Sequence, residues 1–332
     1  QGQSGSRVTW YSQQQFRAPG DPPVQAPQMR SEERHAAPQA WQGWGTTPYM
    51  CHPWASAQSA EVAARAVLRS TDVVVVTFPK TGTTLLQQLC EMLRSDGDMS
   101  FPEITERQPW LDFAYDAGQD LDADHARTPR IFKSHVRLTA INPGAKYISI
   151  IRDPASTAAS LFAFQKLKNR ARVAHCADAD AFVTGGLFDV VFGTNVWEYY
   201  VDLWEARNEP TVKVLCYETL AKAREKHVPF IADFMGLECG DGLLQLVLHN
   251  TSKEYMMQQD EKFNDNFLNE RMTELGRSAN PMTMAPKVTT GNSRLSPHVV
   301  EMLEARWREI VTPRTGHDTY QAMASEISAP FV

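Results

Sequence analysis

The chain has 332 residues, of which 42% are hydrophobic, and it carries a formal net charge of −6. This hydrophobic fraction excludes a chain that is disordered over most of its length. The acidic balance excludes a protein that coats nucleic acid or an anionic membrane, because both partners require a basic surface. No run of 18 or more apolar residues occurs, so the sequence predicts no membrane span.

Cysteine usage favours a reducing, cytoplasmic compartment. The number of cysteines is odd, and no two of them have CxxC spacing, so neither a disulfide framework nor a zinc ribbon is indicated. The five residues are Cys51, Cys90, Cys176, Cys216 and Cys239.

The first part of the chain differs from the rest in composition. Residues 1–54 are rich in Gln, Pro and Gly and show neither helical nor strand periodicity, so we predict a loosely ordered extension. Large apolar residues between Trp41 and Trp54 leave open that this part docks on the core. Residues 55–332 are predicted to form one domain.

From residue 56 onward, helical and strand patterns alternate. Strands are predicted at 73–78, 130–133, 146–151 and 212–216, and the first is a continuous β-branched run typical of a buried parallel strand. Helices are predicted at 56–69, 83–94, 154–168, 195–207, 224–235 and 297–310, with loops and short helices at 251–296. The alternation predicts a single α/β domain of three layers, with a central parallel sheet flanked by helices on both faces.

The turn after the first strand has the composition of an anion-binding loop. It lies before a helix start, where unpaired backbone N–H groups bind phosphate-like anions. Lys80 adds a full charge, Gly82 allows close approach of the backbone, and Thr81, Thr83 and Thr84 add hydroxyl donors. It is not a Walker A loop, because the lysine precedes the glycine. A capped turn with an exposed lysine is the alternative.

Two further predicted strands also end in basic or titratable residues. Lys133 and His135 follow the second strand, and a histidine there can act as a general base. Arg152 follows the third strand, with Ser160 eight residues later on the next helix. Carboxyl ends of parallel strands form ligand sites, so we expect these residues to line one edge of the sheet and bind a ligand with several anionic groups.

In these segments the sequence resembles the cytosolic sulfotransferase family, whose members use 3′-phosphoadenosine 5′-phosphosulfate (PAPS) as sulfuryl donor. The resemblance covers about residues 56–311 and implies a P-loop-like fold, PAPS as donor, 3′-phosphoadenosine 5′-phosphate (PAP) as product, and no metal. Four stretches match in order: residues 79–85, residues 133–135, the pair Arg152 and Ser160, and residues 217–219.

The resemblance also implies roles for individual residues. His135 takes the proton from the acceptor, while Lys80 and Lys133 stabilise charge on the transferring group and the leaving phosphate. The residues implied to hold the donor are Lys80, Thr81, Gly82, Thr83, Thr84, Leu85, Arg152, Ser160, Tyr217, Thr251 and Lys287.

The sequence departs from the family pattern at three places. Leu85 replaces the usual tryptophan that stacks on adenine, and Lys253 replaces a phenylalanine. The late Arg-Lys-Gly loop is reduced to Lys287 without its arginine, and Arg294 is a possible substitute. We therefore expect a divergent member of the family.

The acceptor is predicted to be a small molecule carrying a hydroxyl or amine. Trp110, Phe113, Phe162 and Phe164 lie where family members place acceptor-facing side chains, although core packing is the alternative for each. A run of aspartates between residues 112 and 124 is interpreted as a solvated face, and attraction of a cationic acceptor is the alternative. No nucleic-acid or membrane partner is expected, and the chain is predicted to be a monomer or a homodimer.

Three alternatives remain open at this stage. One is a catalytically silent protein that binds PAPS or PAP. Another is a P-loop-like nucleotide kinase, which the position of Lys80 disfavours because Walker-type loops place the lysine after the glycine. The third is a secretory-pathway sulfotransferase, in which residues 1–54 are a stem.

Overall fold

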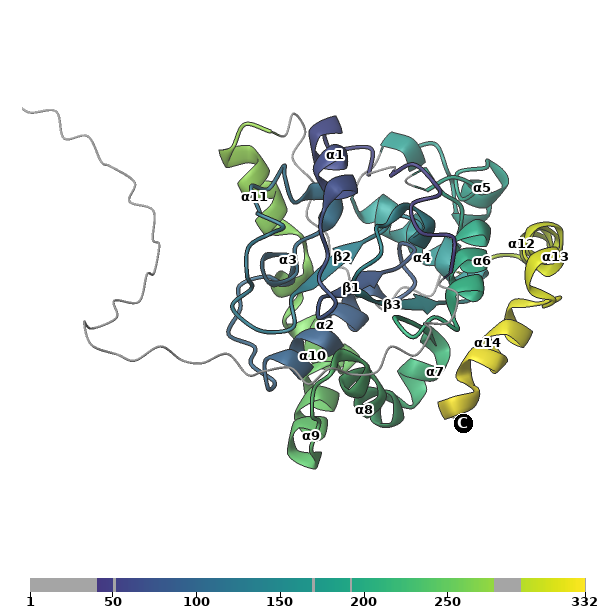
Figure 1. The fold of residues 1–332 in the computed structure, drawn as a ribbon. Helices are drawn as coiled ribbons and strands as arrows, with labels where there is room; N and C mark the ends of the chain where they lie inside the picture. The colour runs from purple at the N-terminus through teal and green to yellow at the C-terminus, as the bar shows by residue number, and fades with distance from the viewer. Residues whose placement is uncertain (1–40, 50–51, 169–170, 192, 278–293, 332) are drawn as a thin grey trace, which may run out of the picture. The chain divides into compact units, whose positions relative to one another are not determined.

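Four parallel strands form the central sheet in the order β2-β1-β3-β4. They are β1 (Val73–Val76), β2 (Ile131–Ser134), β3 (Lys146–Ile151) and β4 (Val212–Cys216), close to the predicted bounds. Figure 1 labels β2, β1 and β3. The structure is a computed structural model, and it describes residues 41–49, 52–168, 171–191, 193–277 and 294–331. All of these belong to one compact unit, residues 40–332.

Each face of the sheet is covered by its own hydrophobic cluster. Along β1, Val73 and Val75 join one cluster, while Val74 and Val76 join the other, because successive side chains of a strand point to opposite faces. The first face is covered by α2 (Thr83–Arg94), α8 (Arg224–Met235) and α9 (Asp241–Asn250). The second is covered by α4 (Pro154–Leu167), α6 (Val196–Ala206) and α12 (Pro297–Ile310). The predicted three-layer α/β fold is confirmed.

Shorter helices connect these elements. The predicted helix at 56–69 is shorter than expected and ends at Arg65, where the side-chain amide of Asn142 donates to the carbonyls of Ala64 (2.8 Å) and Ala66 (3.3 Å) and satisfies the helix C-terminus. The remaining helices are α1 (Ala57–Arg65), α3 (Ile104–Arg107), α5 (Ala179–Thr184), α7 (Tyr217–Lys222), α10 (Lys253–Gln258), α11 (Asn266–Glu274), α13 (Thr312–Thr315) and α14 (Tyr320–Ser328).

Part of the predicted N-terminal extension contacts the core. Trp41 and Trp44 pack against the second-face cluster, and the Trp44 ring lies 4.5 Å from that of Tyr147. The division into 1–54 and 55–332 stays a prediction, because residues 1–40 and 50–51 lie outside the described part. Among the described residues, none of the helices is both long and apolar enough to span a bilayer.

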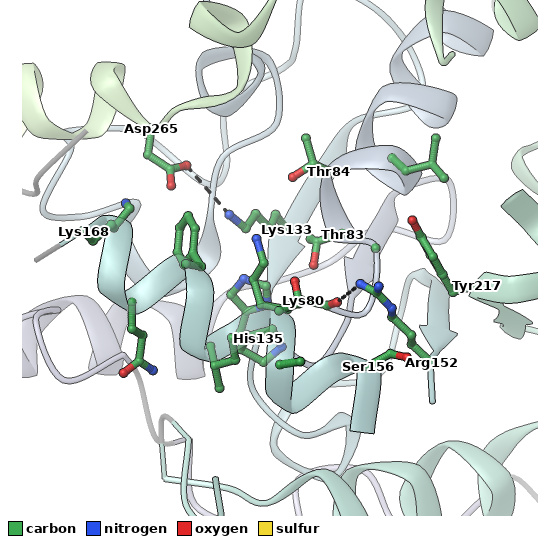
Figure 2. A pocket seen from close by; sticks show the side chains of 18 of the residues that line it. Lys80, Thr83, Thr84, Lys133, His135, Arg152, Ser156, Lys168, Tyr217 and Asp265 are labelled. Atoms are coloured by element: carbon green, nitrogen blue, oxygen red, sulfur yellow. Dashed lines mark hydrogen bonds and ion pairs between the residues drawn. The ribbon is translucent and has the colours of Figure 1, made fainter. Parts of the chain in front are cut away.

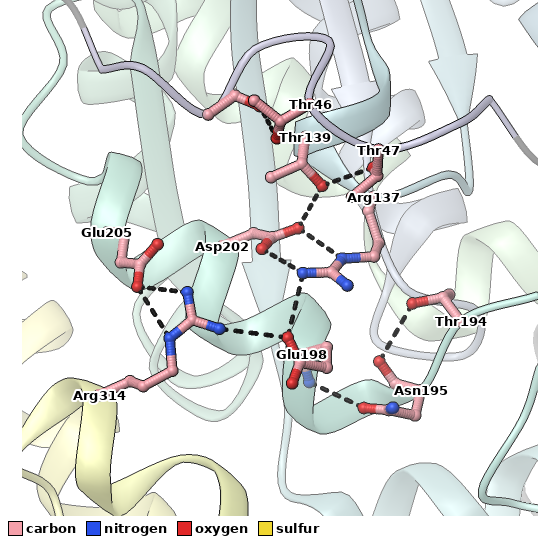
Figure 3. A network of polar contacts seen from close by, with 11 residues as sticks. Thr46, Thr47, Arg137, Thr139, Thr194, Asn195, Glu198, Asp202, Glu205 and Arg314 are labelled. Atoms are coloured by element: carbon pink, nitrogen blue, oxygen red, sulfur yellow. Dashed lines mark hydrogen bonds and ion pairs between the residues drawn. The ribbon is translucent and has the colours of Figure 1, made fainter.

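A polar network joins distant segments behind the end of β2 (Figure 3). The Arg137 guanidinium donates to both carboxylate oxygens of Asp202 on α6, at 2.6 and 2.7 Å. The hydroxyl of Thr139 donates to the same carboxylate (2.9 Å) and contacts that of Thr47 (2.9 Å). Arg314 of α13 bonds Glu205 and Glu198 on α6. These bonds hold residues 137–139 in place, directly after the predicted catalytic residue His135.

Candidate active site

The ends of the strands open into one cavity of about 1020 Å³. Its lining is strongly basic although the whole chain is acidic, which favours an anionic ligand. The basic residues that line it are Lys80, Lys133, Arg152, Lys168, Arg172, Arg224, Lys253 and Arg294, and the acidic ones are Glu254 and Asp265.

The loop between β1 and α2 forms a cradle at one wall of this cavity. Lys80 and Gly82 both adopt positive φ angles, +69° and +125°. The side chain of Thr77 is hydrogen-bonded to that of Thr83 (2.6 Å), which fixes the loop from inside. No side chain caps the N-terminus of α2, so its first backbone N–H groups and its dipole are available to an anion.

His135 is held in a defined tautomer at the end of β2. Its Nδ1 lies 2.7 Å from the carbonyl oxygen of Thr77, and a carbonyl only accepts, so Nδ1 carries the proton. In the neutral ring, Nε2 is then the basic nitrogen. The side chain is 8% exposed and lines the cavity, so a ligand in the cavity can reach the ring.

Lys133 lies beside His135 and is almost fully buried. Its Nζ is 3.7 Å from the centre of the Trp110 ring and 3.9 Å from Oδ1 of Asp265 (Figure 2). The His135 ring meets Trp110 edge-to-face with centroids 5.1 Å apart. Trp110 therefore contacts both predicted catalytic side chains.

Arg152 is held at both its backbone and its side chain. The Tyr200 hydroxyl donates to the Arg152 carbonyl (2.6 Å) and accepts from its N–H (3.0 Å). The guanidinium donates to the carbonyl of Lys80 (3.0 Å) and lies 4.4 Å from the Tyr217 ring centre (Figure 2). Arg152 thus connects the end of β3 with the anion loop.

Glu218 holds the start of α4, directly after Arg152. One carboxylate oxygen accepts from the backbone N–H of Asp153 (3.0 Å). The other accepts from the hydroxyl of Tyr320 on α14 (2.6 Å) and from the thiol of Cys216 (3.1 Å). The C-terminal helix is therefore linked to the residue that follows Arg152.

One face of α4 runs along the cavity. Ser156, Ser160, Phe164 and Lys168 all line it, and their spacing of four residues places them on one side of the helix and its C-cap. Phe164 lies between two lysines, with Lys80 Nζ 4.1 Å and Lys168 Nζ 4.9 Å from its ring centre. Ser156 and Lys168 were not among the sequence predictions, although the i, i+4 spacing from Ser160 could have indicated both.

Most of the predicted site residues line this one cavity. They are Lys80, Gly82, Thr83, Thr84, Leu85, Trp110, Lys133, His135, Arg152, Ser160, Phe164, Tyr217 and Thr251, together with Arg294. Thr81, Phe113 and Phe162 are buried but do not line it; the Thr81 hydroxyl donates to the Phe78 carbonyl (2.8 Å) instead. Lys287 lies outside the described residues. The roles assigned to all of these residues stay predictions.

The aspartate run is predicted from the sequence to be a solvated face, but only some of these aspartates are exposed to solvent. Asp120, Asp122 and Asp124 are exposed, but Asp112 and Asp116 are each only 1% exposed. Both buried carboxylates accept two hydrogen bonds from neighbouring residues, and these bonds offset the free-energy cost of removing the charges from water. Charge patterning alone gave no signal for this division.

Comparisons with known proteins identify the family of this chain. Residues 70–293 match the family model described as the sulfotransferase domain. A 3-alpha-hydroxysteroid sulfotransferase of Cavia porcellus is 27% identical over 211 residues, 60% of this chain and 71% of that protein. Sulfotransferase 1C2 of Homo sapiens is 24% identical over 217 residues, 61% and 69% of the two chains.

Solved structures of similar fold include a retinol dehydratase in complex with androsterone and the inactive cofactor PAP. It has a TM-score of 0.62 at 19% identity, over 82% of this chain and 88% of that one. A mouse sulfotransferase complexed with PAP has a TM-score of 0.56 at 17% identity, over 83% and 94%. Because the family model covers more than half of the sequence, this chain belongs to the sulfotransferase domain family and is an enzyme of the sulfotransferase class.

Proposed function

We propose that this sulfotransferase transfers a sulfuryl group from PAPS to a hydroxyl or amine of a small-molecule acceptor by in-line displacement. The observation that carries the proposal is the convergence of Lys80, the Lys133–His135 segment and Arg152 on one basic cavity beside the uncapped N-terminus of α2. Both structural neighbours described above hold PAP, the product of such a donor.

The residues present fit such a donor. Gly82 adopts a φ of +125°, which L side chains rarely adopt, and it lines the cavity together with Thr83 and Thr84. Nε of Arg152 is buried and has no hydrogen-bond partner among the described residues, so it can donate to a phosphate oxygen. We assign the 5′-phosphosulfate to the anion loop and the 3′-phosphate to Arg152 and Ser160.

Each predicted catalytic side chain has a chemical task. His135 accepts the acceptor's proton at Nε2 while the acceptor oxygen or nitrogen forms its bond to sulfur. Lys80 and Lys133 stabilise the negative charge that grows on the leaving phosphate oxygen as its bond to sulfur breaks. By analogy with phosphoryl transfer, positioning and charge stabilisation supply most of the rate.

Location and partners follow from the same proposal. Cys90, Cys176, Cys216 and Cys239 are all free thiols, which supports a reducing, cytoplasmic location. No group of three or more metal-ligating side chains is found within the part of the chain that the structure describes. The partners that we propose are PAPS and a small-molecule acceptor, with the chain acting as a monomer or a homodimer.

Calorimetry with PAP in metal-free buffer tests the donor site. Wild-type protein is expected to bind, and Lys80→Ala and Arg152→Ala are each expected to weaken binding by more than about 1.4 kcal/mol, a factor of ten. Arg306→Ala, at an exposed arginine of α12 paired with Glu309, is the control and should bind like wild type. A requirement for Mg²⁺ would favour a nucleotide kinase, and tight PAP binding without transfer to any acceptor would favour the silent binding protein.

A substitution at Leu85 tests how the adenine is held. Leu85 lines the cavity with Tyr217 and Arg224, and it replaces the family's tryptophan. Leu85→Trp is expected to strengthen PAP binding by about 1–3 kcal/mol, the usual contribution of a base stacked on an aromatic ring. The same calorimetry measures it, with Leu85→Met as a matched apolar control. Equal affinities for the two variants would show that adenine does not lie against this residue.

A further inference from the structure

We infer that Asp112 is a positioning residue of this active site, which holds the Trp110 ring against Lys133 and His135. This inference rests on the proposed function, because it concerns the proposed catalytic side chains. Asp112 lies in the short 3₁₀ turn Leu111–Phe113 and does not itself line the cavity.

The Asp112 carboxylate collects donors from both segments that form the catalytic wall. Its Oδ2 accepts from Nε1 of Trp110 (2.7 Å) and from the hydroxyl of Ser134 (2.9 Å). The backbone N–H groups of Asp112 itself and of His135 also hydrogen-bond to the carboxylate. Burial raises the pKa of Asp112 to about 6 even though these bonds oppose the rise, and each of the donors that faces the carboxylate favours its ionised form.

Backbone pairing alone does not determine how the Trp110 ring is oriented. The Lys133 N–H donates to the carbonyl of Pro109 (2.9 Å), so the chain at 109–110 runs alongside the end of β2. This pairing fixes the position of the Trp110 backbone but not the rotation of its side chain. The hydrogen bond from the indole N–H to Asp112 fixes that rotation, which presents the ring face to the Lys133 ammonium at 3.7 Å.

The same carboxylate also fixes the chain after β2. The Ser134 hydroxyl donates to Asp112 and accepts from the Val136 N–H (3.2 Å), so it ties both sides of His135. One buried carboxylate thereby sets the geometry of the ring that contacts Lys133 and His135 and of the backbone that carries both. Hydrogen bonds to an ionised group are about twice as strong as those between neutral groups, so an aspartate can hold the Trp110 ring and the chain after β2 more firmly than a neutral acceptor could.

Asp112→Asn is the direct test, because it keeps the shape and turns one acceptor oxygen into a donor that opposes the N–H groups facing it. We expect kcat for transfer from PAPS to 4-nitrophenol, and for hydrolysis of PAPS with water as acceptor, to fall about 10- to 100-fold. PAP affinity should stay within about twofold of wild type, since Arg152 and the anion loop lie on other strand ends. The Trp110 indole N–H resonance, assigned with Trp110→Phe, should move upfield.

Asp116→Asn is the matched control. Asp116 lies on the same loop, is equally buried and accepts two bonds, from the N–H (2.8 Å) and hydroxyl (2.5 Å) of Ser56. Unlike Trp110, which donates to Asp112, Ser56 does not line the cavity. This variant should lose stability and keep kcat. An equal loss of kcat in both variants, or unchanged kcat in Asp112→Asn, would overturn the inference.

Two milder variants keep the test decisive if Asp112→Asn does not fold. Ser134→Ala removes one donor to Asp112, and Trp110→Phe keeps a ring face for Lys133 but loses the indole N–H. Each should lower kcat with little change in PAP affinity, and their combination should cost less than the product of the two single effects. Full activity in both would contradict the role of Asp112. Failure of the wild type to bind PAP would instead contradict the proposed function.

Discussion

Replacing His135 with alanine is expected to lower kcat by about 10²–10⁴-fold, the usual contribution of a general base. The Nδ1–H of His135 donates to the Thr77 carbonyl, so Nε2 is the nitrogen that accepts the proton, and alanine removes it. PAP affinity should change little, because the proposed phosphate contacts come from Lys80 and Arg152. The measurement is steady-state transfer to 4-nitrophenol beside calorimetry with PAP.

His298→Ala provides the comparison for a histidine outside the cavity. His298 is exposed at the start of α12 and does not line the site, so this variant should have wild-type kcat and PAP affinity. Retention of more than about a tenth of wild-type kcat by His135→Ala would assign proton transfer to another group or to solvent. A parallel loss of PAP affinity would show that His135 holds the donor.

Gly82→Ala is expected to weaken PAP binding at least about tenfold and to destabilise the fold by about 1–3 kcal/mol. A φ of +125° is outside the range that L side chains adopt readily. An added Cβ would lie 2.8 Å from Cδ2 of Tyr217 and 3.3 Å from Cδ1 of Ile150. Because the Tyr217 ring stacks on Arg152, its displacement disturbs the proposed 3′-phosphate contact as well as the anion loop.

Gly276→Ala separates backbone strain from the steric clash. Gly276 follows α11 with a φ of +64°, and nothing lies within 4 Å of the position that a Cβ would take. Thermal unfolding and PAP calorimetry on both variants should show a modest loss of stability for Gly276→Ala with unchanged PAP binding. If Gly82→Ala binds PAP like Gly276→Ala, the close packing at Gly82 is not required for the donor.

Elements with strong local patterns could be predicted from the sequence almost to the residue. The continuous valines of β1 and the leucine spacing of α2 require only neighbours along the chain, and the predicted bounds of α2, β3, β4, α8 and α12 match the structure. The end of α1 could not be predicted in this way. It depends on the side-chain amide of Asn142, which reaches the last carbonyls of the helix from far along the chain.

The same distinction applies to the site. Basic residues at strand ends could be assigned to one cavity, because parallel strands bring their carboxyl ends together. The partners of Lys133 could not, since Trp110 and Asp265 reach it from segments with no local signal of contact. The burial of Asp112 likewise could not be predicted, because the sequence pattern of an aspartate in an acidic run is the same whether its carboxylate faces water or a tryptophan N–H.

The bond between Glu218 and Tyr320 has a consequence for the energetics of the whole chain. One carboxylate oxygen of Glu218 accepts a hydrogen bond from the backbone N–H that follows Arg152, and the other accepts one from Tyr320 on the C-terminal helix. If Arg152 binds the donor as proposed, coupling through Glu218 is reciprocal, so donor binding is expected to raise the free energy needed to detach α14 by the amount that docking of α14 adds to donor affinity. We therefore expect the last helix to contribute to donor affinity, although α14 contributes no side chain to the wall of the cavity.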